Sequence, residues 1–297
     1  MRALTNDDAG PRLTEVAEPT LRPSQVLVEI HAISLNFGEL TYRQPVRVPG
    51  WDAAGVVIQA AADGSGPPPG TRVTTFGRHS GWAERRAAET ADLAVVPGTV
   101  DLGAAAALPV AGVTALQALR RLGPVIGRRV LVTGASGGVG RFAVQLAARA
   151  GAEVVASVGD PARGEQLAEL GATEIVTSLE QVEEPVFGVL DNVGGHQAAE
   201  AFALLEEGGS LQSVGKASGE ATTIDFEAER LRGGDRRLEP FVVRTPFGRD
   251  LTYLVGLLAE GGLDPQIGWR GPWDRAAEAA DALLSRRVRG KAVLDVH

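Results

Sequence analysis

Seven residues near the middle of the chain have the composition and spacing of a phosphate-binding turn. Gly134-Ala-Ser-Gly-Gly-Val-Gly140 follows a β-branched strand pattern and precedes an apolar helical pattern. In the register of the dinucleotide fingerprint, such a turn lets a pyrophosphate approach the backbone and lets the helix pack closely on the strand. The helix start offers free N–H groups and the positive end of its dipole. The pattern predicts a dinucleotide site made of Ala135, Ser136, Gly137, Gly138, Val139 and Gly140.

The end of the next predicted strand indicates which dinucleotide is bound. NAD sites usually place an acid there, whose carboxylate binds the ribose 2′-hydroxyl. Here the strand ends in Val158-Gly159 without an acid, and Arg163 follows within a turn, where it could bind a 2′-phosphate. Asp160 could serve a 2′-hydroxyl, but it is also a favoured N-cap before Pro161. We therefore expect an N-cap at Asp160 and NADPH as cofactor, with NADH the less favoured alternative, and we add Gly159 and Arg163 to the predicted site.

Composition excludes several other chemistries. The 297 residues include no cysteine, which excludes disulfides, thiolate nucleophiles and Cys-ligated zinc. No two of the four histidines have the spacing of metal ligands, so we predict no metal site. These histidines are His31, His79, His196 and His297.

Charge and hydropathy bear on partners and location. The net charge of −8 gives no bulk attraction to nucleic acid or to an anionic membrane. No apolar run reaches the roughly 20 residues of a membrane span. The first residues lack the apolar stretch of a signal peptide, so we expect a cytoplasmic protein.

The chain divides into two parts with different secondary-structure patterns. Residues 1–100 have short alternating strand patterns with Gly/Pro turns, typical of a small barrel or sandwich. From about residue 104, strands alternate with helices, which predicts a parallel sheet. The expected strands are 26–33, 53–58, 72–76, 129–133, 153–158, 174–177, 187–191, 210–214, 237–244 and 291–296. The expected helices are 104–108, 114–122, 139–150, 161–170, 197–205, 250–260 and 274–286.

Five further motifs occur in a fixed order around the phosphate turn: Ser34-Leu-Asn-Phe37, Pro49-Gly-Trp-Asp-Ala-Ala-Gly-Val-Val57, Leu108-Pro-Val-Ala-Gly-Val-Thr-Ala115, Asp191-Asn-Val-Gly-Gly195 and Arg289-Gly-Lys-Ala-Val-Leu294. Together they resemble the medium-chain dehydrogenase/reductase superfamily, in its zinc-free quinone-oxidoreductase branch, over nearly the whole chain. The resemblance implies an α/β fold: a GroES-like β-rich catalytic domain plus a Rossmann domain with a doubly wound parallel sheet. It places the catalytic domain at 1–103 and 243–297 and the Rossmann domain at 104–242.

The resemblance also implies roles for single residues. Asn36 matches an Asn near the nicotinamide, and Thr114 a Thr at the mouth of the cofactor cleft. Asn192 and Val193 lie where the family's chain passes over the adenine-ribose and the nicotinamide. Lys291 matches a C-terminal Gly-Lys near the cofactor.

The resemblance further implies the reaction. Zinc members hold their metal with a Cys near Asn36 and a His-Glu pair at Trp51-Asp52, and this chain lacks the Cys and the His. Hydride transfer to a quinone or an α,β-unsaturated carbonyl then fits better than alcohol oxidation. For the acceptor oxygen we expect the Asn36 amide first, with Thr114, Tyr42 and water as alternatives. Tyr42 is displaced from the position of a proton-donating Tyr in enoyl reductases.

Two other functions stay open at this point: an enoyl-thioester reductase of a biosynthetic pathway, and a non-catalytic dinucleotide-binding scaffold or redox sensor. We also expect a homodimer. Residues 237–244 look like the last strand of the parallel sheet, and an unpaired edge there would favour pairing with its twin across a two-fold axis. Pro240 removes one donor from that edge.

Overall fold

The computed structural model describes residues 1–7, 10–42 and 47–297, and it divides the chain into two compact units. The first unit contains Met1–Val113 and Arg244–His297, and the second contains Thr114–Val243. The division falls inside helix α3 (Pro109–Leu122). Residues 104–113 therefore group with the first unit, whereas the sequence pattern placed them in the second.

The second unit is built on a six-stranded parallel sheet in the order β10-β9-β8-β11-β12-β13. Numbered within the sheet, this order is 3-2-1-4-5-6, the doubly wound order of a Rossmann fold. The inner strands carry near-continuous buried aliphatic runs, as expected where both faces of a parallel sheet are covered. The strands are β8 (Arg129–Val132), β9 (Glu153–Ser157), β10 (Ala172–Val176), β11 (Val186–Asp191), β12 (Leu205–Ser213) and β13 (Arg237–Pro240).

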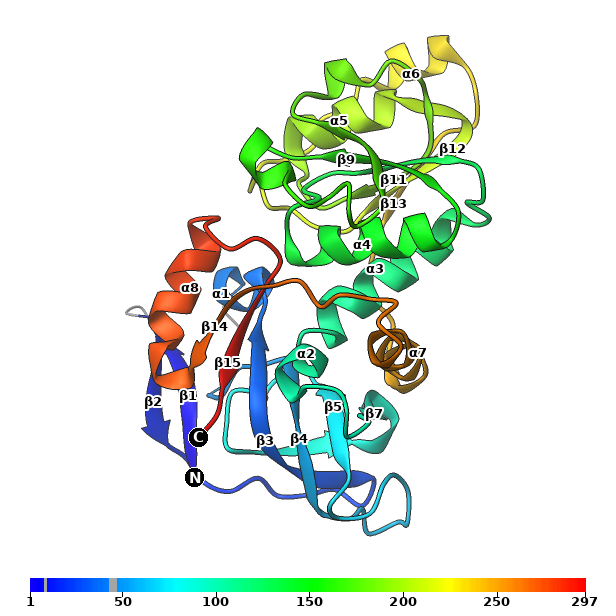
Figure 1. Ribbon diagram of the computed structural model, residues 1–297. Coiled ribbons are helices and arrows are strands. Elements are labelled where there is room, and N and C mark those ends of the chain that lie inside the picture. The colour runs from blue at the N-terminus through cyan, green and yellow to red at the C-terminus, as the bar shows by residue number, and fades with distance from the viewer. Residues whose placement is uncertain (8–9, 43–46) are drawn as a thin grey trace. The chain divides into compact units, whose positions relative to one another are not determined.

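Helices cover both faces of this sheet. Figure 1 shows α3 and α4 (Gly138–Arg149) on one face, and α5 (Gly195–Ala203) and α6 (Phe226–Arg232) on the other. The aliphatic core around Val155, Val189 and Leu211 is closed by Ala201 and Phe202 of α5. The prediction of a doubly wound α/β domain is confirmed for this unit.

One predicted helix of the second unit is wrong. Residues 161–170 form only a 3-10 turn, Pro161–Gly164, followed by further turns. Gln166 has a φ of 67°, a left-handed conformation that a right-handed helix cannot contain. The predicted N-cap is confirmed, because the Asp160 carboxylate accepts a hydrogen bond from the Ala162 N–H (2.8 Å) at the start of this turn.

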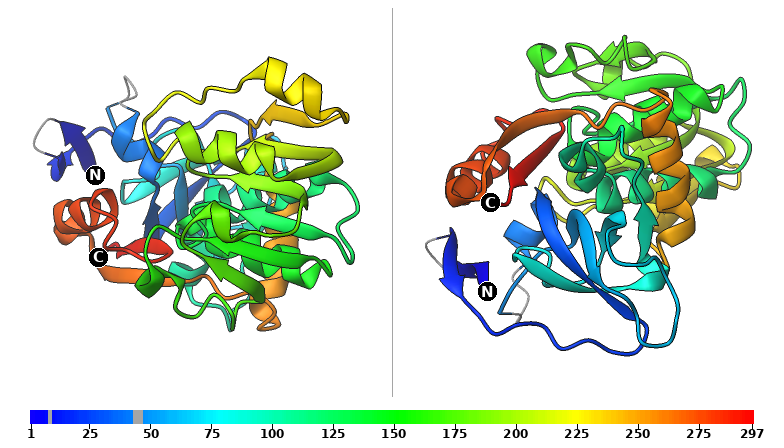
Figure 2. Two further views of the ribbon diagram at one scale, coloured as in Figure 1. Left: turned by 90° about the horizontal axis from the view of Figure 1, so that it is seen from above. Right: turned by 60° about the horizontal axis from the view of Figure 1, so that its bottom comes forward.

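The first unit is built on a seven-stranded sheet in the order β14-β15-β3-β4-β5-β7, with β6 paired to β3. β3 is the longest strand, and its Val26, Val28 and Ile30 alternate into the core. The last strand, β15, lies between β14 and β3 (Figures 1 and 2). These strands are β3 (Gln25–Leu35), β4 (Asp52–Gln59), β5 (Arg72–Phe76), β6 (Arg85–Glu89), β7 (Leu93–Val95), β14 (Ile267–Pro272) and β15 (Lys291–Asp295).

Short elements complete the first unit. An antiparallel hairpin of β1 (Arg2–Asp7) and β2 (Gly10–Glu15), which the sequence pattern did not predict, packs against α8 (Ala276–Leu284). The remaining helices are α1 (Phe37–Thr41), α2 (Leu102–Ala106) and α7 (Gly248–Ala259). Four short 3-10 turns across the described chain are Thr90–Asp92, Pro161–Gly164, Leu179–Gln181 and Trp273–Arg275. The β-rich domain predicted for this part is confirmed.

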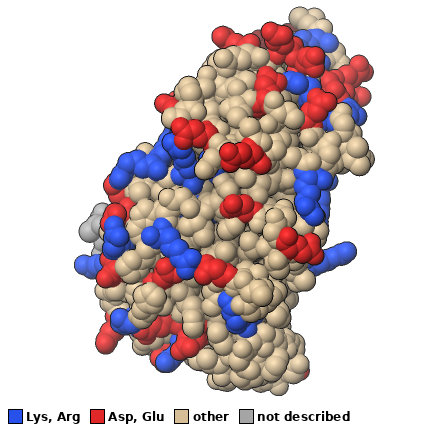
Figure 3. Space-filling model, in the orientation of Figure 1, with Lys and Arg blue, Asp and Glu red and all other residues tan. Residues whose placement is uncertain are grey.

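Charged side chains are mixed on the surface. On the face drawn in Figure 3, Lys and Arg side chains are interspersed with Asp and Glu in both units. Ion pairs such as Arg85 with Glu18 and Arg129 with Glu174 bring the two signs together locally. No helix in the described part of the chain is long and apolar enough to cross a membrane.

Candidate functional site

The phosphate turn of the second unit lies between β8 and α4. Gly134 has a φ of 59°, and the Ala135 N–H donates to the Ser157 carbonyl of β9 (3.0 Å), which fastens the turn to the sheet. A Cβ on Gly140 would lie 2.4 Å from the Gly134 carbonyl oxygen. Glycine is therefore required at positions 134 and 140 by the fold itself.

Gly137 differs from these two glycines. It is the N-cap of α4, with an ordinary φ of −81°. A Cβ added there would meet only the Gly134 carbonyl oxygen, at an ordinary contact distance of 3.4 Å. Nothing in the fold thus excludes a side chain at this position, which faces the free N–H groups of the helix start. The missing side chain leaves room for a group that binds there.

A buried carboxylate joins this turn to the next strand end. The Thr133 hydroxyl donates to Asp191 Oδ1 (2.6 Å), and the Gly194 N–H donates to Asp191 Oδ2 (3.0 Å). Asn192 Nδ2 donates to the Thr133 carbonyl (2.9 Å), and Val193 packs beside Gly134. Burial raises the pKa of Asp191, while the Thr133 hydroxyl and the loop N–H groups act in the opposite direction. The predicted residues Asn192 and Val193 are therefore held against the phosphate turn, and the Asn192 side chain serves as a fastener.

The predicted residue Arg163 also reaches the turn. Its Nε donates to the Ser136 hydroxyl at 3.0 Å, across the gap between the β9–β10 connection and the phosphate turn. Gly159, at the end of β9, has no atom within 4 Å of an added Cβ. Thr114 is buried in α3. Within the second unit, the structure brings together Ser136 and Arg163 on one side and Asn192 and Val193 on another.

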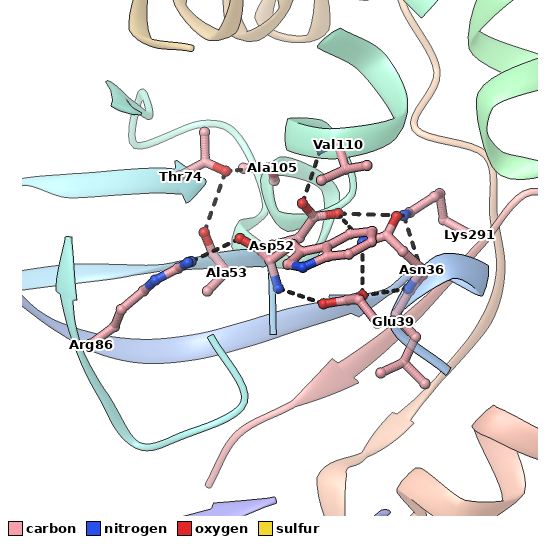
Figure 4. Close-up of polar contacts among 11 residues, drawn as sticks. Asn36, Glu39, Asp52, Ala53, Thr74, Arg86, Ala105, Val110 and Lys291 are labelled. Atoms are coloured by element: carbon pink, nitrogen blue, oxygen red, sulfur yellow. Dashed lines mark hydrogen bonds and ion pairs between the residues drawn. The ribbon is translucent and has the colours of Figure 1, made fainter. Parts of the chain in front are cut away.

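The first unit contains a buried polar cluster (Figure 4) around Lys291. Its ammonium donates to Asn36 Oδ1 (2.7 Å), to the Leu35 carbonyl (3.3 Å) and to Asp52 Oδ2 (3.5 Å). Asn36 Nδ2 in turn donates to Glu39 Oε2 and to Asp52 Oδ2, at 2.9 Å each. The predicted residues Asn36 and Lys291 therefore contact each other, and all their side-chain polar groups are occupied within the chain.

Glu39 and Asp52 are the two carboxylates of this cluster. Glu39 accepts hydrogen bonds from the backbone N–H groups of Asn36 (2.8 Å) and Trp51, and Asp52 accepts one from the Val110 N–H (3.0 Å). Burial raises the pKa of both carboxyls, that of Glu39 to about 8, and the nearby Asp52 carboxylate adds to the shift at Glu39. Two desolvated acids are thus held by a small number of donors.

Arg86 supplies a second buried positive charge. Its guanidinium donates to the carbonyls of Trp51 (2.9 Å) and His79 (3.0 Å) and to the Thr75 hydroxyl (3.1 Å), and not to a carboxylate. Burial lowers the pKa of Arg86 to about 10, while the charges of Asp52 and Glu39 act in the opposite direction. Arg86 therefore stays charged at neutral pH beside the cluster.

The other predicted catalytic residue of the first unit, Tyr42, follows α1 and is 58% exposed. Gly38, one turn earlier in α1, packs against the Trp51 ring. A Cβ added at Gly38 would lie only 2.9 Å from that ring, so glycine allows the contact. Residues 43–46, which follow Tyr42, lie outside the described residues.

Sequence reasoning missed Glu39, Arg86 and Thr133. The Asn36-x-x-Glu39 spacing was a usable signal for Glu39, because an acid three residues after an N-cap often accepts the N-cap backbone N–H. No local pattern marks Arg86, whose partners come from three separate segments. No group of three or more His, Cys, Asp or Glu side chains in the described part of the chain is arranged to hold a metal ion.

Comparisons with known proteins identify the family. The alcohol dehydrogenase GroES-like domain matches residues 22–118, and the zinc-binding dehydrogenase family matches residues 170–294. A probable zinc-binding mitochondrial oxidoreductase from Arthroderma benhamiae is 31% identical, over 99% of this chain and 96% of its own length. The chain belongs to the medium-chain dehydrogenase/reductase superfamily.

Within this superfamily, the chain falls in the quinone oxidoreductase-like branch. The quinone oxidoreductase from Coxiella burnetii superimposes with a TM-score of 0.88 at 27% identity, covering 100% of this chain and 99% of that one. The acrylyl-CoA reductase from Ruegeria pomeroyi is 33% identical over 88% of this chain and 84% of its own. The relatives are oxidoreductases, which confirms the enzyme class expected from the sequence.

The raised pKa of Glu39 makes stability depend on pH. The folded chain holds a proton, up to about pH 8, that the unfolded chain releases near the ordinary value of 4.5. The resulting stability is fully present below about pH 4.5 and is lost as pH rises through about 8. We expect the melting temperature, measured by calorimetry at pH 6 and pH 9, to fall about 3 °C more in the wild type than in Glu39→Gln.

The change in melting temperature between pH 6 and pH 9 separates this effect from any loss of packing in the variant. Lost packing would lower the melting temperature at both pH values together. Glu220→Gln, at an exposed glutamate, is the matched control and should leave the difference between pH 6 and pH 9 as in the wild type. An equal fall in wild type and Glu39→Gln would mean that Glu39 is ionised across this range.

Proposed function

We propose that this chain is a zinc-independent, NADPH-dependent oxidoreductase that transfers hydride to a quinone or an α,β-unsaturated carbonyl. The observation that carries the dinucleotide is Gly137, a glycine with ordinary backbone angles at a position where a Cβ would make only an ordinary contact. The fold has no use for a glycine here, but a pyrophosphate resting on the start of α4 does. When bound, the cofactor supplies the hydride, that is, two electrons and one proton.

NADPH is favoured over NADH by the groups at the end of β9. Arg163 already reaches the phosphate turn through Ser136 and offers a guanidinium to a 2′-phosphate. The carboxylate of Asp160, the one acid that could bind a 2′-hydroxyl, accepts the Ala162 N–H as an N-cap. An arginine that reaches the phosphate turn and an acid that caps the following turn together favour NADPH.

The donor for the acceptor oxygen follows from the contacts of the first unit. Asn36 was the first choice from sequence, but both hydrogens of its amide are donated to Glu39 and Asp52. It could stabilise a developing oxyanion only by breaking one of these bonds. We therefore favour the hydroxyls of Thr114 and Tyr42, or water, as donors, and assign Asn36 and Lys291 to shaping the first unit. The proton that completes the reduction then comes from one of these hydroxyls or from solvent.

Metal independence is part of the proposal. The Lys291 ammonium already contacts Asn36 and Asp52, so a positive charge is supplied there by the chain itself. The chain has no cysteine, and Trp51 stands where zinc members carry a histidine. Hydride transfer to an already conjugated acceptor leaves charge that hydrogen bonds can stabilise without a Lewis acid.

Substitution at Gly137 tests the dinucleotide site. Gly137→Asp should abolish NADPH binding in a fluorescence titration, because the side chain enters the pyrophosphate position and adds like charge. The melting temperature of the free protein should stay within about 2 °C of the wild type, since the fold leaves room for the Cβ. Gly98→Asp, at another glycine with open space, is the control and should bind normally. Normal NADPH binding by Gly137→Asp would place the cofactor elsewhere.

A panel of acceptors tests the reaction. Simple quinones, small enones and enoyl-coenzyme A thioesters are assayed with NADPH and with NADH, each with and without a chelator. We expect turnover of a quinone or an enone with NADPH that survives chelation. Turnover of thioesters alone would select the enoyl-thioester reductase, as in the Ruegeria pomeroyi relative. Dinucleotide binding with no turnover of any acceptor would favour the scaffold or sensor, and activity lost to chelation and restored by zinc would refute metal independence.

We also propose a homodimer formed through β13. This strand pairs with β12 and is an edge of the six-stranded sheet, so its other side carries backbone groups without a strand partner among the described residues. Exposed apolar side chains occur in β13, just after it and in the preceding helix α6. They are Phe226, Leu231, Leu238 and Val242. A second copy pairing along β13 would cover the edge and this apolar surface together.

The dimer is tested by light scattering at micromolar concentration. We expect twice the chain mass of 30.9 kDa for the wild type and a shift toward the monomer for Val242→Asp, which places a charge in the apolar surface. Ile126→Asp changes another exposed apolar residue, outside β13 and α6, and should stay dimeric. A monomeric wild type would reject the proposed interface.

A further inference from the structure

The connection between β9 and β10 is fastened to the rest of the second unit at two neighbouring points. Arg163, within the connection, donates from Nε to the Ser136 hydroxyl of the phosphate turn (3.0 Å). Two residues later, the Glu165 carbonyl accepts a hydrogen bond from Nη2 of Arg141 (3.2 Å). Arg141 belongs to α4, the helix that begins at the phosphate turn. Both hydrogen bonds are donated by arginines. Arg163 donates from the connection to the phosphate turn, and Arg141 donates from α4 to the connection.

The place of Arg141 is unusual for a cation. It is the fourth residue of α4, close to the positive end of the helix dipole, and its side chain is 1% exposed. A positive charge there is disfavoured by the dipole and by desolvation. An apolar residue at this position would pack in the core at lower electrostatic cost, as the neighbouring Phe142 and Val144 do. The reach of the guanidinium to Glu165 is what an aliphatic side chain cannot supply.

The connection needs such a fastener because its backbone is irregular. Residues 161–170 lack the continuous hydrogen-bond ladder of an α-helix, and Gln166 interrupts any helical path with its positive φ. Leu167 packs in the core, and the chain turns back to β10 at Gly171. The segment that carries Arg163 is thus anchored by side chains more than by secondary structure.

We propose that Arg141 is a positioning residue for cofactor selection: by binding the Glu165 carbonyl, it holds the β9–β10 connection so that Arg163 faces the 2′-phosphate of NADPH. The inference rests on the proposed dinucleotide site. NADPH and NADH differ only in the 2′-phosphate, so a displaced Arg163 weakens NADPH alone. Arg141 acts through Arg163 and does not itself touch the cofactor.

The test is a double-mutant cycle on the full-length chain, read out as dissociation constants for NADPH and NADH by fluorescence titration. Arg163→Ala should raise the NADPH constant about tenfold or more, because a charge-assisted hydrogen bond is lost. Arg141→Met, which keeps the length of the apolar stem, should raise it about fivefold. Neither variant should change the NADH constant more than about twofold. In the Arg163→Ala background, Arg141→Met should have almost no further effect on NADPH binding.

Hydrogen exchange supplies a readout that does not depend on cofactor binding. Peptides covering residues 160–171 should exchange faster in Arg141→Met than in the wild type, while peptides of β8 and β11 stay unchanged. Arg141→Lys keeps the charge without the guanidinium fork, and it should resemble Arg141→Met in exchange and in NADPH binding. It also serves if Arg141→Met fails to fold.

Several outcomes would overturn the inference. Equal weakening of NADPH and NADH would make Arg141 merely structural, and additive effects of the two substitutions would mean that it acts independently of Arg163. Unchanged exchange over residues 160–171 would remove the positioning role. A wild type that binds neither dinucleotide would instead refute the proposed function, which is a distinct result.

Discussion

Two carboxyl groups of the first unit, those of Glu39 and Asp52, are almost entirely removed from water, and side chains and N–H groups from several segments surround them. An isolated buried charge costs several kcal/mol, so each acid must be met by donors or by a positive charge. Lys291 meets this demand from β15, the last strand, and Asn36 bridges both acids from the end of β3. The identity of these residues is therefore fixed by electrostatics before any chemistry is considered.

The second unit shows how a glycine-rich motif can be separated into its parts. Gly134 and Gly140 are required by backbone geometry, whereas Gly137 is required by nothing in the fold. Asp191 links this turn to the loop after β11 through Thr133 and Gly194. The phosphate turn is thus a backbone surface that lacks a side chain at Gly137, although the fold would accept a Cβ there. Such a surface suits an anionic ligand bound by N–H groups.

Prediction from sequence succeeded where the signal was local. The strand 72–76 was placed to the residue, and the strands before and after the phosphate turn to within one residue, because short β-branched runs between turn residues are distinctive. It failed at 161–170, where a helical composition contains a left-handed residue, and it missed the hairpin β1–β2. The order of the motifs predicted both domain types. That prediction rested on several segments along the chain, so an error in one element did not affect it.

Prediction of the site was limited by distance along the chain. The residues of the phosphate turn are contiguous, so their spacing could be interpreted directly. The contact of Lys291 with Asn36 joins residues 255 positions apart. Arg86 binds backbone carbonyl groups, which every residue carries and which no sequence pattern marks. Sequence similarity to a family could place Asn36 and Lys291 near a site, but it could not show that each occupies the polar groups of the other. That knowledge requires the packing of β15 beside β3.

The position of β15 has a consequence for synthesis. A ribosome produces Thr114–Val243 as one continuous stretch, so the second unit can fold while the chain is still growing. The first unit cannot, because β15 lies between β14 and β3 and follows the whole second unit along the chain. Until it arrives, one side of the apolar strand end Ala32–Leu35 has no partner, and Asp52 lacks its ammonium. Residues 1–113 are therefore made with this strand edge still unpaired, and Thr114–Val243 must be synthesised before β15 can cover it.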